Sequence, residues 1–554
     1  MKKIFFFIFL LFNIANAQIG FVEYYNPVYK FLERMSSRHL IDDYNSFVIP
    51  KTRTEIAGHL SSLIPKRNNL NEIDNEIFSD LLVEFQYDIT GSTKYLESKI
   101  TDFQFSNLIS DREKYLYSYT DTNDVSIFMN LEGSIENIFY KNNELGKSYN
   151  SFLGVMGGSI RASFLNKIGF YIRATNGIVK GDKEAARFKD QLNRNYKFNE
   201  FQTDQATYFD ETEGYLLADF DYVKFSIGRN RNILGYGIEK SILSNSAPMM
   251  DQLGLQINYK FLSFTWMHAK ILGPQNAYSD STFGTIRTIT DKYFVTHRLA
   301  FDLGRHLSFG FGENIIYADR SVDFSYLNPF NFYKTVEHEN KDRDNSQIFF
   351  DAVNNSIKGL KLYTEIIIDD IDFSKLGTGW YGNQALINLA AYSTQLNDII
   401  PIDFKMQYLR IDPYFYSHRL AKNNFTNDDV PLGSSIEPNS ESFIFEINYR
   451  PYYRLDLSLN FRYTNHGANE LNEEGTILVN HGGDILFGHR SFDSINAGLL
   501  EGVKEVKRVF SFEGVYEPIN NYFVRLNVKY INNDLQNNIR VNDLFTSVYL
   551  FVKI

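Results

Sequence analysis

The chain of 554 residues contains no cysteine and only two tryptophans. Without cysteine it can form no disulfide bond and no thiolate metal site. Beyond its first residues it has no stretch of about 18 uncharged apolar residues, which excludes a membrane-spanning helix. Positive charge is also scarce, because 56 Lys and Arg stand against 67 Asp and Glu. This acidic balance argues against nucleic acid as a partner.

Aromatic residues, by contrast, are abundant. The chain has 49 Phe and 37 Tyr, and aromatics make up 16% of all residues. The mean hydropathy is nevertheless slightly negative, at −0.30. This combination is unusual for a soluble enzyme. It is typical of a membrane barrel, in which half of each strand faces lipid and half faces water.

The first 17 residues have the three parts of a secretory signal peptide. Lys2 and Lys3 precede an apolar run over 4–14, and Ala15-Asn16-Ala17 forms a cleavage site. We therefore expect residues 1–17 to be removed and the mature chain to begin at Gln18. Its Lys and Arg then number 56 − 2 = 54, and its net charge is 54 − 67 = −13.

From Val125 onward, apolar and polar side chains alternate along short segments, most clearly in residues 453–463. Since a strand points successive side chains to opposite faces, each segment has an apolar and a polar face. Roughly 16 to 19 such segments predict a mainly β fold, a large antiparallel transmembrane β-barrel of about 16–18 strands over 87–554. The alternative is a periplasmic β-sandwich. Polar stretches at 177–212, 272–291 and 421–440 are expected to be long loops.

Residues 18–86 have a helical period instead. Asn26 and Pro27 form a helix start, and Thr52 with Glu55 forms a capping box for a second helix. A third helix is expected from about Leu70, with an apolar face of Ile73, Ile77 and Leu81. These short amphipathic helices predict a small N-terminal helical bundle, which we expect to pack at the periplasmic mouth of the barrel.

Several segments in succession resemble the Wzi-type capsule assembly family of outer-membrane proteins. They are Asn26-Pro27-Val28-Tyr29, Lys51-Thr52-Arg53-Thr54-Glu55, Leu234-Gly235-Tyr236-Gly237, Gly312-Glu313, Tyr326-Leu327-Asn328-Pro329, Asp344-Asn345, Asn465-His466-Gly467-Ala468-Asn469 and Gly482-Gly483-Asp484. The resemblance implies a monomeric barrel in the outer membrane of a Gram-negative bacterium. It also implies a lectin-like role, in which capsular or exopolysaccharide is bound at the cell surface. The partners would then be surface polysaccharide, outer-membrane lipid and, during insertion, the barrel-assembly machinery.

The candidate polysaccharide-binding residues are of two kinds, and each kind has a structural alternative. Carboxylates and amides can hydrogen-bond sugar hydroxyls, or pair with lumenal arginines such as Arg298. Aromatic rings can stack on sugars, or form the girdle at the membrane interface. The candidates are Glu313, Asp344, Asn345, Tyr326, Asn328, Phe330, His466 and Asn469.

Asp369, Asp370 and Asp372 form the one acidic cluster with a possible metal role, since Ca²⁺ favours oxygen ligands. The spacing does not match an EF-hand, and a solvated strand end or a lumenal charge network is the preferred interpretation. No cofactor and no catalytic residue are expected. Two alternative functions stay open: a porin or solute channel of the outer membrane, and a barrel enzyme acting on lipid or glycan.

Overall fold

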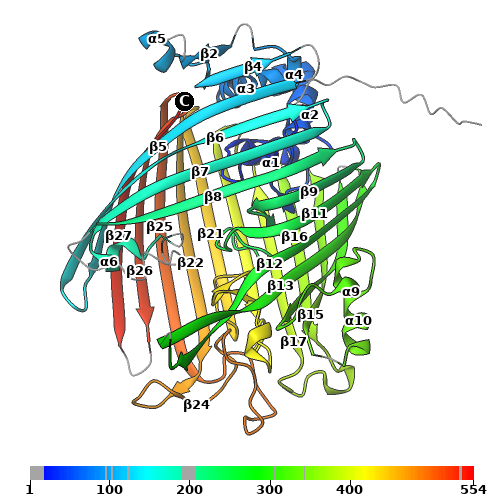
Figure 1. Ribbon diagram of the computed structural model, residues 1–554, viewed down its shortest axis with the longest axis vertical. Coiled ribbons are helices and arrows are strands. Elements are labelled where there is room, and N and C mark those ends of the chain that lie inside the picture. Colours follow the sequence, from blue (N-terminus) through cyan, green and yellow to red (C-terminus); the bar gives the residue numbers. More distant parts are fainter. Residues whose placement is uncertain are drawn as a thin grey trace, which may run out of the picture.

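The chain forms one closed antiparallel barrel of 18 strands, shown in Figure 1. The computed structural model describes residues 18–93, 96–100, 104–121, 125–189, 192, 206–282, 284–304, 306–341, 343–397, 399–535 and 539–554. The expected signal peptide, 1–17, lies outside these residues. The prediction of a barrel of about 16–18 strands is confirmed at its upper value.

Each strand of the ring pairs with the next one along it, and the last strand pairs with the first, as Phe545 opposite Tyr140 illustrates. The ring consists of β5 (Val125–Asn142), β6 (Lys147–Phe164), β7 (Ile168–Gly181), β8 (Ala206–Asp219), β9 (Val223–Asn230), β11 (Met250–Tyr259), β12 (Leu262–Asp280), β13 (Gly284–Leu303), β14 (Leu307–Ala318), β15 (Asn345–Ile357), β16 (Leu360–Asp370), β17 (Gln384–Ser393), β18 (Ile402–Ile411), β21 (Ser440–Tyr452), β22 (Leu455–Ala468), β25 (Val503–Ile519), β26 (Tyr522–Asp534) and β27 (Arg540–Lys553). Closure leaves no open edge, so the backbone of the wall is paired within the ring.

The two ends of the barrel differ. At one end the strands are joined by short turns such as 165–167, 220–222 and 520–521, and the N-terminal helices lie there (Figure 1). The opposite end carries long connections, including 412–439 and 469–502. These ends are called the helical end and the loop end below.

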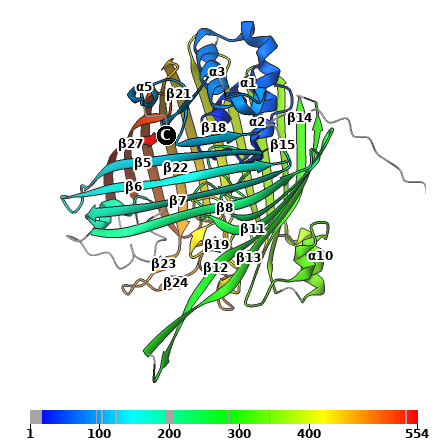
Figure 2. The ribbon, with the colours of Figure 1, turned by 45° about the horizontal axis from the view of Figure 1, so that its top comes forward.

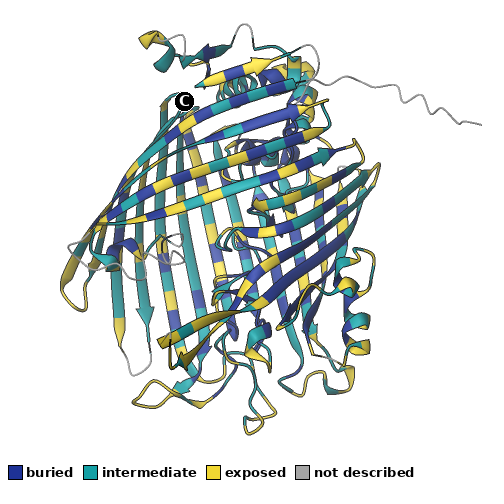
Figure 3. Cartoon of the chain, in the orientation of Figure 1, coloured by how far each residue is buried: buried dark blue, intermediate teal, exposed yellow. Residues whose placement is uncertain are grey.

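The strands show the expected alternation of faces, visible in Figure 3 as alternating buried and exposed positions. On β16, Leu362 and Ile366 are exposed on the outside, whereas Lys361 and Glu365 are buried on the inside. On β22, Leu459 is exposed and apolar. The outer surface is thus suited to lipid, and the charged side chains point inward.

The helices are α1 (Val28–Ser37), α2 (Arg53–Leu63), α3 (Glu72–Glu84) and α4 (Gln86–Thr90). No helix among the described residues has the length and apolar character needed to cross a membrane. The Thr52–Glu55 capping box is present at the start of α2, as predicted. Of the predicted face of α3, Leu81 is buried and Ile77 packs partly buried against the helical core, but Asp74 and Phe78 are buried there and Ile73 is not. Asp74 can be buried because two arginines of the first helix region, Arg34 and Arg38, bind its carboxylate.

The remaining short elements lie at the two ends, inside the ring or, for the two helices between β14 and β15, outside it. They are β1 (Val48–Ile49), η1 (Ile64–Asn69), β2 (Glu97–Lys99), α5 (Phe105–Leu108), β3 (Glu113–Tyr115), β4 (Tyr117–Thr120), α6 (Lys183–Ala186), β10 (Ile233–Leu234), α9 (Phe324–Leu327), α10 (Tyr333–Glu339), η3 (Phe373–Lys375), η4 (Ala421–Asn423), β19 (Thr426–Asn427), β20 (Val430–Pro431), β23 (Glu470–Leu471) and β24 (Ile477–Val479).

The interior beside β12–β18 is packed rather than open. Phe47 of the N-terminal segment contacts Tyr236, whose ring centroid is 5.1 Å away, and Phe349 of the wall. Tyr236 in turn donates its backbone N–H to Glu365 of β16, at 2.6 Å. Side chains of the connection 412–439, Phe415 among them, belong to the same buried cluster. The N-terminal segment and two inward connections, 231–249 and 412–439, therefore fill this side of the barrel.

One expected loop is a pair of strands. Residues 272–291 continue β12 and β13 to the tip of a long hairpin, and Asp280 pairs with Gly284. Beyond the wall both faces of a hairpin meet water, so the apolar alternation that marks a wall strand is missing there. The stretch 177–212 is also shorter as a loop than expected, because β7 ends at Gly181 and β8 begins at Ala206.

Candidate functional site

Three connections meet over the barrel at the loop end: 371–383, 412–439 and 469–502. Asn439 holds two of them together, because its side-chain amide donates to the backbone oxygens of Gly467 at 2.7 Å and Glu501 at 2.8 Å. Its side-chain oxygen accepts the N–H of Leu500 at 2.6 Å. These bonds fix a loop surface by buried hydrogen bonds instead of a long strand ladder.

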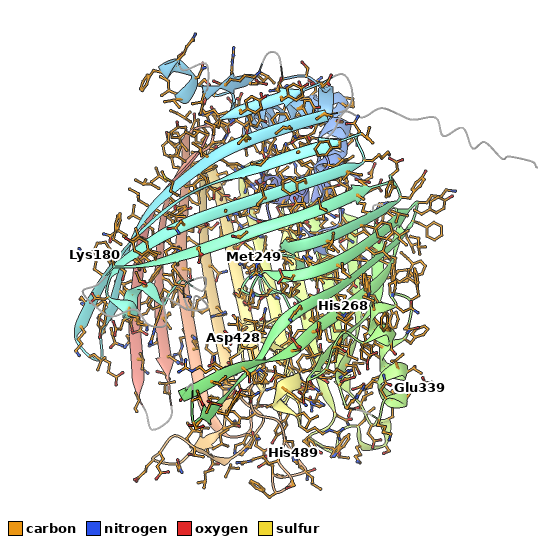
Figure 4. All side chains as sticks on the ribbon, in the orientation of Figure 1. Lys180, Met249, His268, Glu339, Asp428 and His489 are labelled. Atoms are coloured by element: carbon orange, nitrogen blue, oxygen red, sulfur yellow. The ribbon has the colours of Figure 1, made fainter. Side chains whose placement is uncertain are left out.

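Aromatic side chains gather where 371–383 meets 469–502. Tyr381 and His489 are stacked, with ring centroids 3.5 Å apart and planes 9° apart. The edge of Tyr414 lies against His489, at 5.4 Å. Trp380 forms a β-bridge with Asn496. Figure 4 labels His489 at the end of the barrel that is farthest from the helices.

Exposed groups lie beside this stack. Phe487 and Phe492 are exposed, and the Arg490 guanidinium lies 4.6 Å from the Phe492 ring centroid. Arg490 also pairs with Asp493 at 2.8 Å. Partial burial opposes ionisation of Asp493, but hydrogen bonds from Arg490 hold its pKa below the ordinary value. We call Trp380, Tyr381, Phe487, His489, Arg490, Phe492 and Asp493 the loop-end rim.

The rim combines flat apolar faces with fixed hydrogen-bonding groups. Aromatic rings can cover the C–H faces of a sugar, and the Arg490 guanidinium can donate to hydroxyl or carboxylate groups. The Asp493 side chain is only 3% exposed and positions Arg490. The residues of the rim come from two different connections. The arrangement suits an extended polar ligand that lies across the loop end.

His466 and Asn469, predicted from the sequence, lie at the base of the connection 469–502. His466 contacts Glu505 at 3.2 Å and the backbone oxygen of Gly483 at 2.8 Å. The Asn469 side-chain oxygen accepts the N–H of His481 at 2.7 Å. Both side chains therefore shape the loop that carries the rim.

Glu313, Asp344 and Tyr326 are brought together, but on the outer side of the wall and not in the lumen. Asp344 is buried and accepts two bonds from Arg320, at 2.8 and 2.7 Å, and one from the Tyr326 hydroxyl at 2.8 Å. Glu313 pairs with His297 at 3.1 Å. The expectation that these acids pair with lumenal arginines is wrong, since Arg298 instead binds Asp351.

The other candidates of this region have different surroundings. Asn345 is buried on the inner face and donates its amide to the backbone oxygen of Asn423, at 3.0 Å. Asn328 is exposed, and its amide donates to Asn331 at 2.9 Å. Phe330 is exposed and stacks on Phe264 of the outer wall, with centroids 5.2 Å apart.

The acidic cluster does not form a metal site. Asp369 accepts a hydrogen bond from Gln347 at 3.1 Å, and Asp372 caps the short helix η3 through the Ser374 N–H at 3.0 Å. Among the residues that the structure describes, no group of three or more His, Asp or Glu could hold a metal ion. Asp369 and Asp372 thus have hydrogen-bonding partners within the chain.

The rim residues were missed in the sequence because no strand or helix pattern marks them. Trp380 and Tyr381 lie in Gly377-Thr378-Gly379-Trp380-Tyr381-Gly382, where a large aromatic pair interrupts a run of glycines. Such a pair in a turn-rich segment could have indicated a binding site, because binding residues lie disproportionately on loops.

A family model described as capsule assembly protein Wzi matches residues 129–520. Among solved structures, Wzi of Escherichia coli, described as a carbohydrate-binding β-barrel of the outer membrane involved in group 1 capsule assembly, aligns with a TM-score of 0.54 and 12% identity, over 96% of this chain and 99% of that one. OccAB4 of Acinetobacter baumannii aligns with a TM-score of 0.42 and 10% identity, over 77% and 98%. OpdQ of Pseudomonas aeruginosa gives 0.40 and 11%, over 77% and 98%. No curated protein sequence matches the chain.

The Escherichia coli structure supports the barrel fold at this low identity. The family match is the stronger evidence of relationship, because it extends from β5 to the turn after β25. It therefore covers most of the wall and all three connections of the loop end. With a closed wall and an apolar outer surface, the protein is a β-barrel of the Gram-negative outer membrane. The chain belongs to the Wzi capsule assembly family.

Proposed function

We propose that this protein binds surface polysaccharide during capsule or exopolysaccharide assembly, and that the loop-end rim is its contact face. The observation that carries the proposal is the rim itself, an aromatic and hydrogen-bonding surface on loops that are joined by hydrogen bonds at one end of the barrel. The family supports the same function, since Escherichia coli Wzi is described as carbohydrate-binding. The chain would act as a monomer.

The orientation of the barrel follows from its turns. Outer-membrane barrels have short turns on the periplasmic side and long loops outside. The helical end, with the N-terminal segment 18–90, therefore faces the periplasm, and the rim faces the cell exterior. In this orientation the rim meets polysaccharide at the cell surface.

Binding without transport or catalysis suits this interior and this rim. A porin needs a water-filled path, whereas Phe47, Tyr236 and Phe415 fill the interior beside β12–β18. A glycan hydrolase needs two carboxylates flanking one bond. Asp493 is the one rim carboxylate, and it is paired with Arg490. The polysaccharide would be held by several weak contacts.

The test is binding of purified, detergent-folded protein to the polysaccharide of the host surface, for wild type and the double variant Phe487→Ala, Phe492→Ala. Both rings are exposed, so their removal should leave the fold intact. We expect at least a tenfold loss of affinity, about 1.4 kcal/mol, because stacking area is lost. Phe105→Ala, at the helical end, is the matched control, since Phe105 is 70% exposed and Phe492 76%. Equal binding by all three proteins would contradict the assignment of the rim.

A further inference from the structure

The connection between β14 and β15 lies on the outside of the barrel. Its described residues, 319–341 with 343 and 344, are called the outer-wall segment. Trp266 of β12 donates its indole N–H to the Tyr333 hydroxyl of this segment at 2.9 Å. The wall residues Tyr293, Val295, Ile315 and Tyr317 share one buried cluster with Tyr326 and Tyr333. Figures 1 and 2 both show α10 outside the ring of strands.

The opposite faces of the same strands confirm which side is outside. Phe294 packs against Phe425 of an inward connection, at 5.5 Å. The Arg298 guanidinium lies 3.9 Å from the ring centroid of Phe47, also in the interior. Because neighbouring residues of a strand point to opposite faces, Val295 and His297 must point away from the lumen.

The outer-wall segment covers polar side chains of the wall. His297 and Glu313 pair at 3.1 Å, and His297 also contacts the backbone oxygen of Pro329 at 3.1 Å. Glu313 accepts the backbone N–H of Tyr333 at 2.8 Å, at the start of α10. A polar pair on a lipid-facing wall is costly unless other groups shield and satisfy it, and the segment provides both.

The position of the outer-wall segment along the barrel axis places it beside the membrane. On β14 the exposed wall residues Leu307 and Phe309 lie next to the turns of the helical end, and Glu313 is already covered. Six residues from Leu307 to Glu313 advance about 20 Å along a strand, or about 15 Å in height at a tilt of about 40°. The apolar band of an outer-membrane barrel is about 25 Å tall. The segment therefore begins within the band, on its outer side.

The surface that the segment turns away from the wall carries three exposed aromatic rings near its start, whereas exposed charged residues lie near its end, at Glu339, Lys341 and Arg343. Phe324, Phe330 and Phe332 are 83%, 66% and 63% exposed. Phe330 also stacks on Phe264 of the wall, at 5.2 Å, so the exposed rings continue the lipid-facing surface. Three exposed rings within nine residues would be unfavourable in water, and aromatic side chains are favoured at a membrane interface.

We propose that the outer-wall segment is a lipid-binding surface, on which Phe324, Phe330 and Phe332 insert among the acyl chains of the outer leaflet. The segment thereby forms part of the membrane-facing wall beside β12–β14. Two of its charged side chains, Asp344 and Arg320, pair with each other. This surface is separate from the rim and does not depend on sugar binding.

The test uses the absence of cysteine in the chain. Single variants Phe324→Cys and Phe332→Cys are labelled with a nitroxide and reconstituted into phosphatidylcholine vesicles. Collisions with oxygen, which concentrates in acyl chains, are compared with collisions with a water-soluble nickel complex. Leu459→Cys on the outer face of β22 is the lipid control. Phe492→Cys, 76% exposed at the rim, is the water control.

We expect the oxygen-to-nickel ratio at both segment positions to match that at Leu459 and to exceed that at Phe492 several-fold. A ratio equal to that at Phe492 at both positions would overturn the proposal. Dipolar broadening between labels, lost on dilution with unlabelled protein, would also overturn it, because a second copy of the chain would then cover the segment. Circular dichroism of each variant establishes that the barrel is folded. If one of the two segment variants does not fold, the other still tests the proposal.

Discussion

Arg34 on α1 and Asp403 on the inner face of β18 lie 3.6 Å apart, both buried. Arg34 also pairs with Asp74 of α3 at 2.8 Å, and Asp403 accepts a bond from Arg450 at 2.8 Å. One guanidinium thus joins two helices to the barrel wall. Removing one member of such a buried network leaves the others without compensation.

Replacement of Arg34 by Met should therefore loosen the N-terminal segment from the barrel. The expected cost is about 3–5 kcal/mol, because Asp74 and Asp403 stay buried with fewer partners. Limited proteolysis of the folded protein measures the effect as faster cleavage between residues 18 and 90.

The control on the same helix is Lys30→Met. Lys30 pairs with Asp456 at 3.2 Å, but its side chain is half exposed. Exposed pairs contribute about 0–1 kcal/mol, so cleavage should stay near the wild-type rate. Equal cleavage of the two variants would show that the Arg34 network does not hold the segment.

Glu84, at the end of α3, should make the docking of this segment depend on pH. Burial, with the nearby charges of Glu113 and Glu23, raises the pKa of Glu84 from 4.5 to about 7. The folded state then binds a proton that the unfolded state has released. Its contribution to stability is present below pH 4.5 and is lost as the pH rises towards 7.

The variant Glu84→Gln keeps an oxygen for the Asn26 amide, which donates to Glu84 at 2.8 Å. Thermal unfolding at about pH 5 and about pH 8 should therefore show a smaller loss of stability for this variant than for wild type. Glu72→Gln, in the exposed first turn of α3, should follow wild type. The same loss in all three proteins would rule out Glu84 as the source.

Gly235 should tolerate no side chain. Its φ is +117°, and an added Cβ would lie 2.9 Å from the Glu365 carboxylate oxygen. We expect Gly235→Ala to cost about 1–3 kcal/mol in urea unfolding, through backbone strain and overpacking. Gly58→Ala is the matched control: its Cβ would meet nothing within 4 Å on helix α2, and it should add about 0.5–1 kcal/mol. Equal effects would contradict the close approach at Gly235.

Glu313→Gln separates the sugar-binding role expected from the sequence from the role in the structure. Glu313 accepts the N–H groups of Tyr333 at 2.8 Å and Lys334 at 3.3 Å. Loss of its charge should destabilise the start of α10 by about 1–2 kcal/mol. Amide exchange of Tyr333–Glu339 should then be faster, and polysaccharide binding should be unchanged. Weaker binding with unchanged exchange would restore Glu313 as a sugar ligand.

The strands of the wall were predictable because each short segment alternates between apolar side chains that face lipid and polar side chains that face the interior. Leu362 and Lys361 differ in polarity since one faces lipid and the other the interior. Helix starts such as Thr52 with Glu55 were also predictable, because a cap is formed within four residues.

The site was less predictable because its partners are distant in the sequence. Glu313 is a polar residue on the outward face of β14, which is otherwise apolar. The sequence pattern therefore predicts that Glu313 faces the lumen. Only the packing of α10 on the outer wall explains it. Asp344 pairs with Arg320, and Tyr381 stacks on His489, because the connections between the strands bring these residues together. The burial of Asp74 on α3 could not be predicted for the same reason, since its carboxylate binds Arg34 of another helix.

The measurement that tests the central claim most directly is glycan binding beside conductance. Purified, detergent-folded protein is applied to a glycan array that includes the host's own surface polysaccharide, and the same sample is inserted into a planar bilayer. We predict specific binding of surface polysaccharide with negligible conductance. Stable conductance without glycan binding would contradict the account and show that the barrel is a channel.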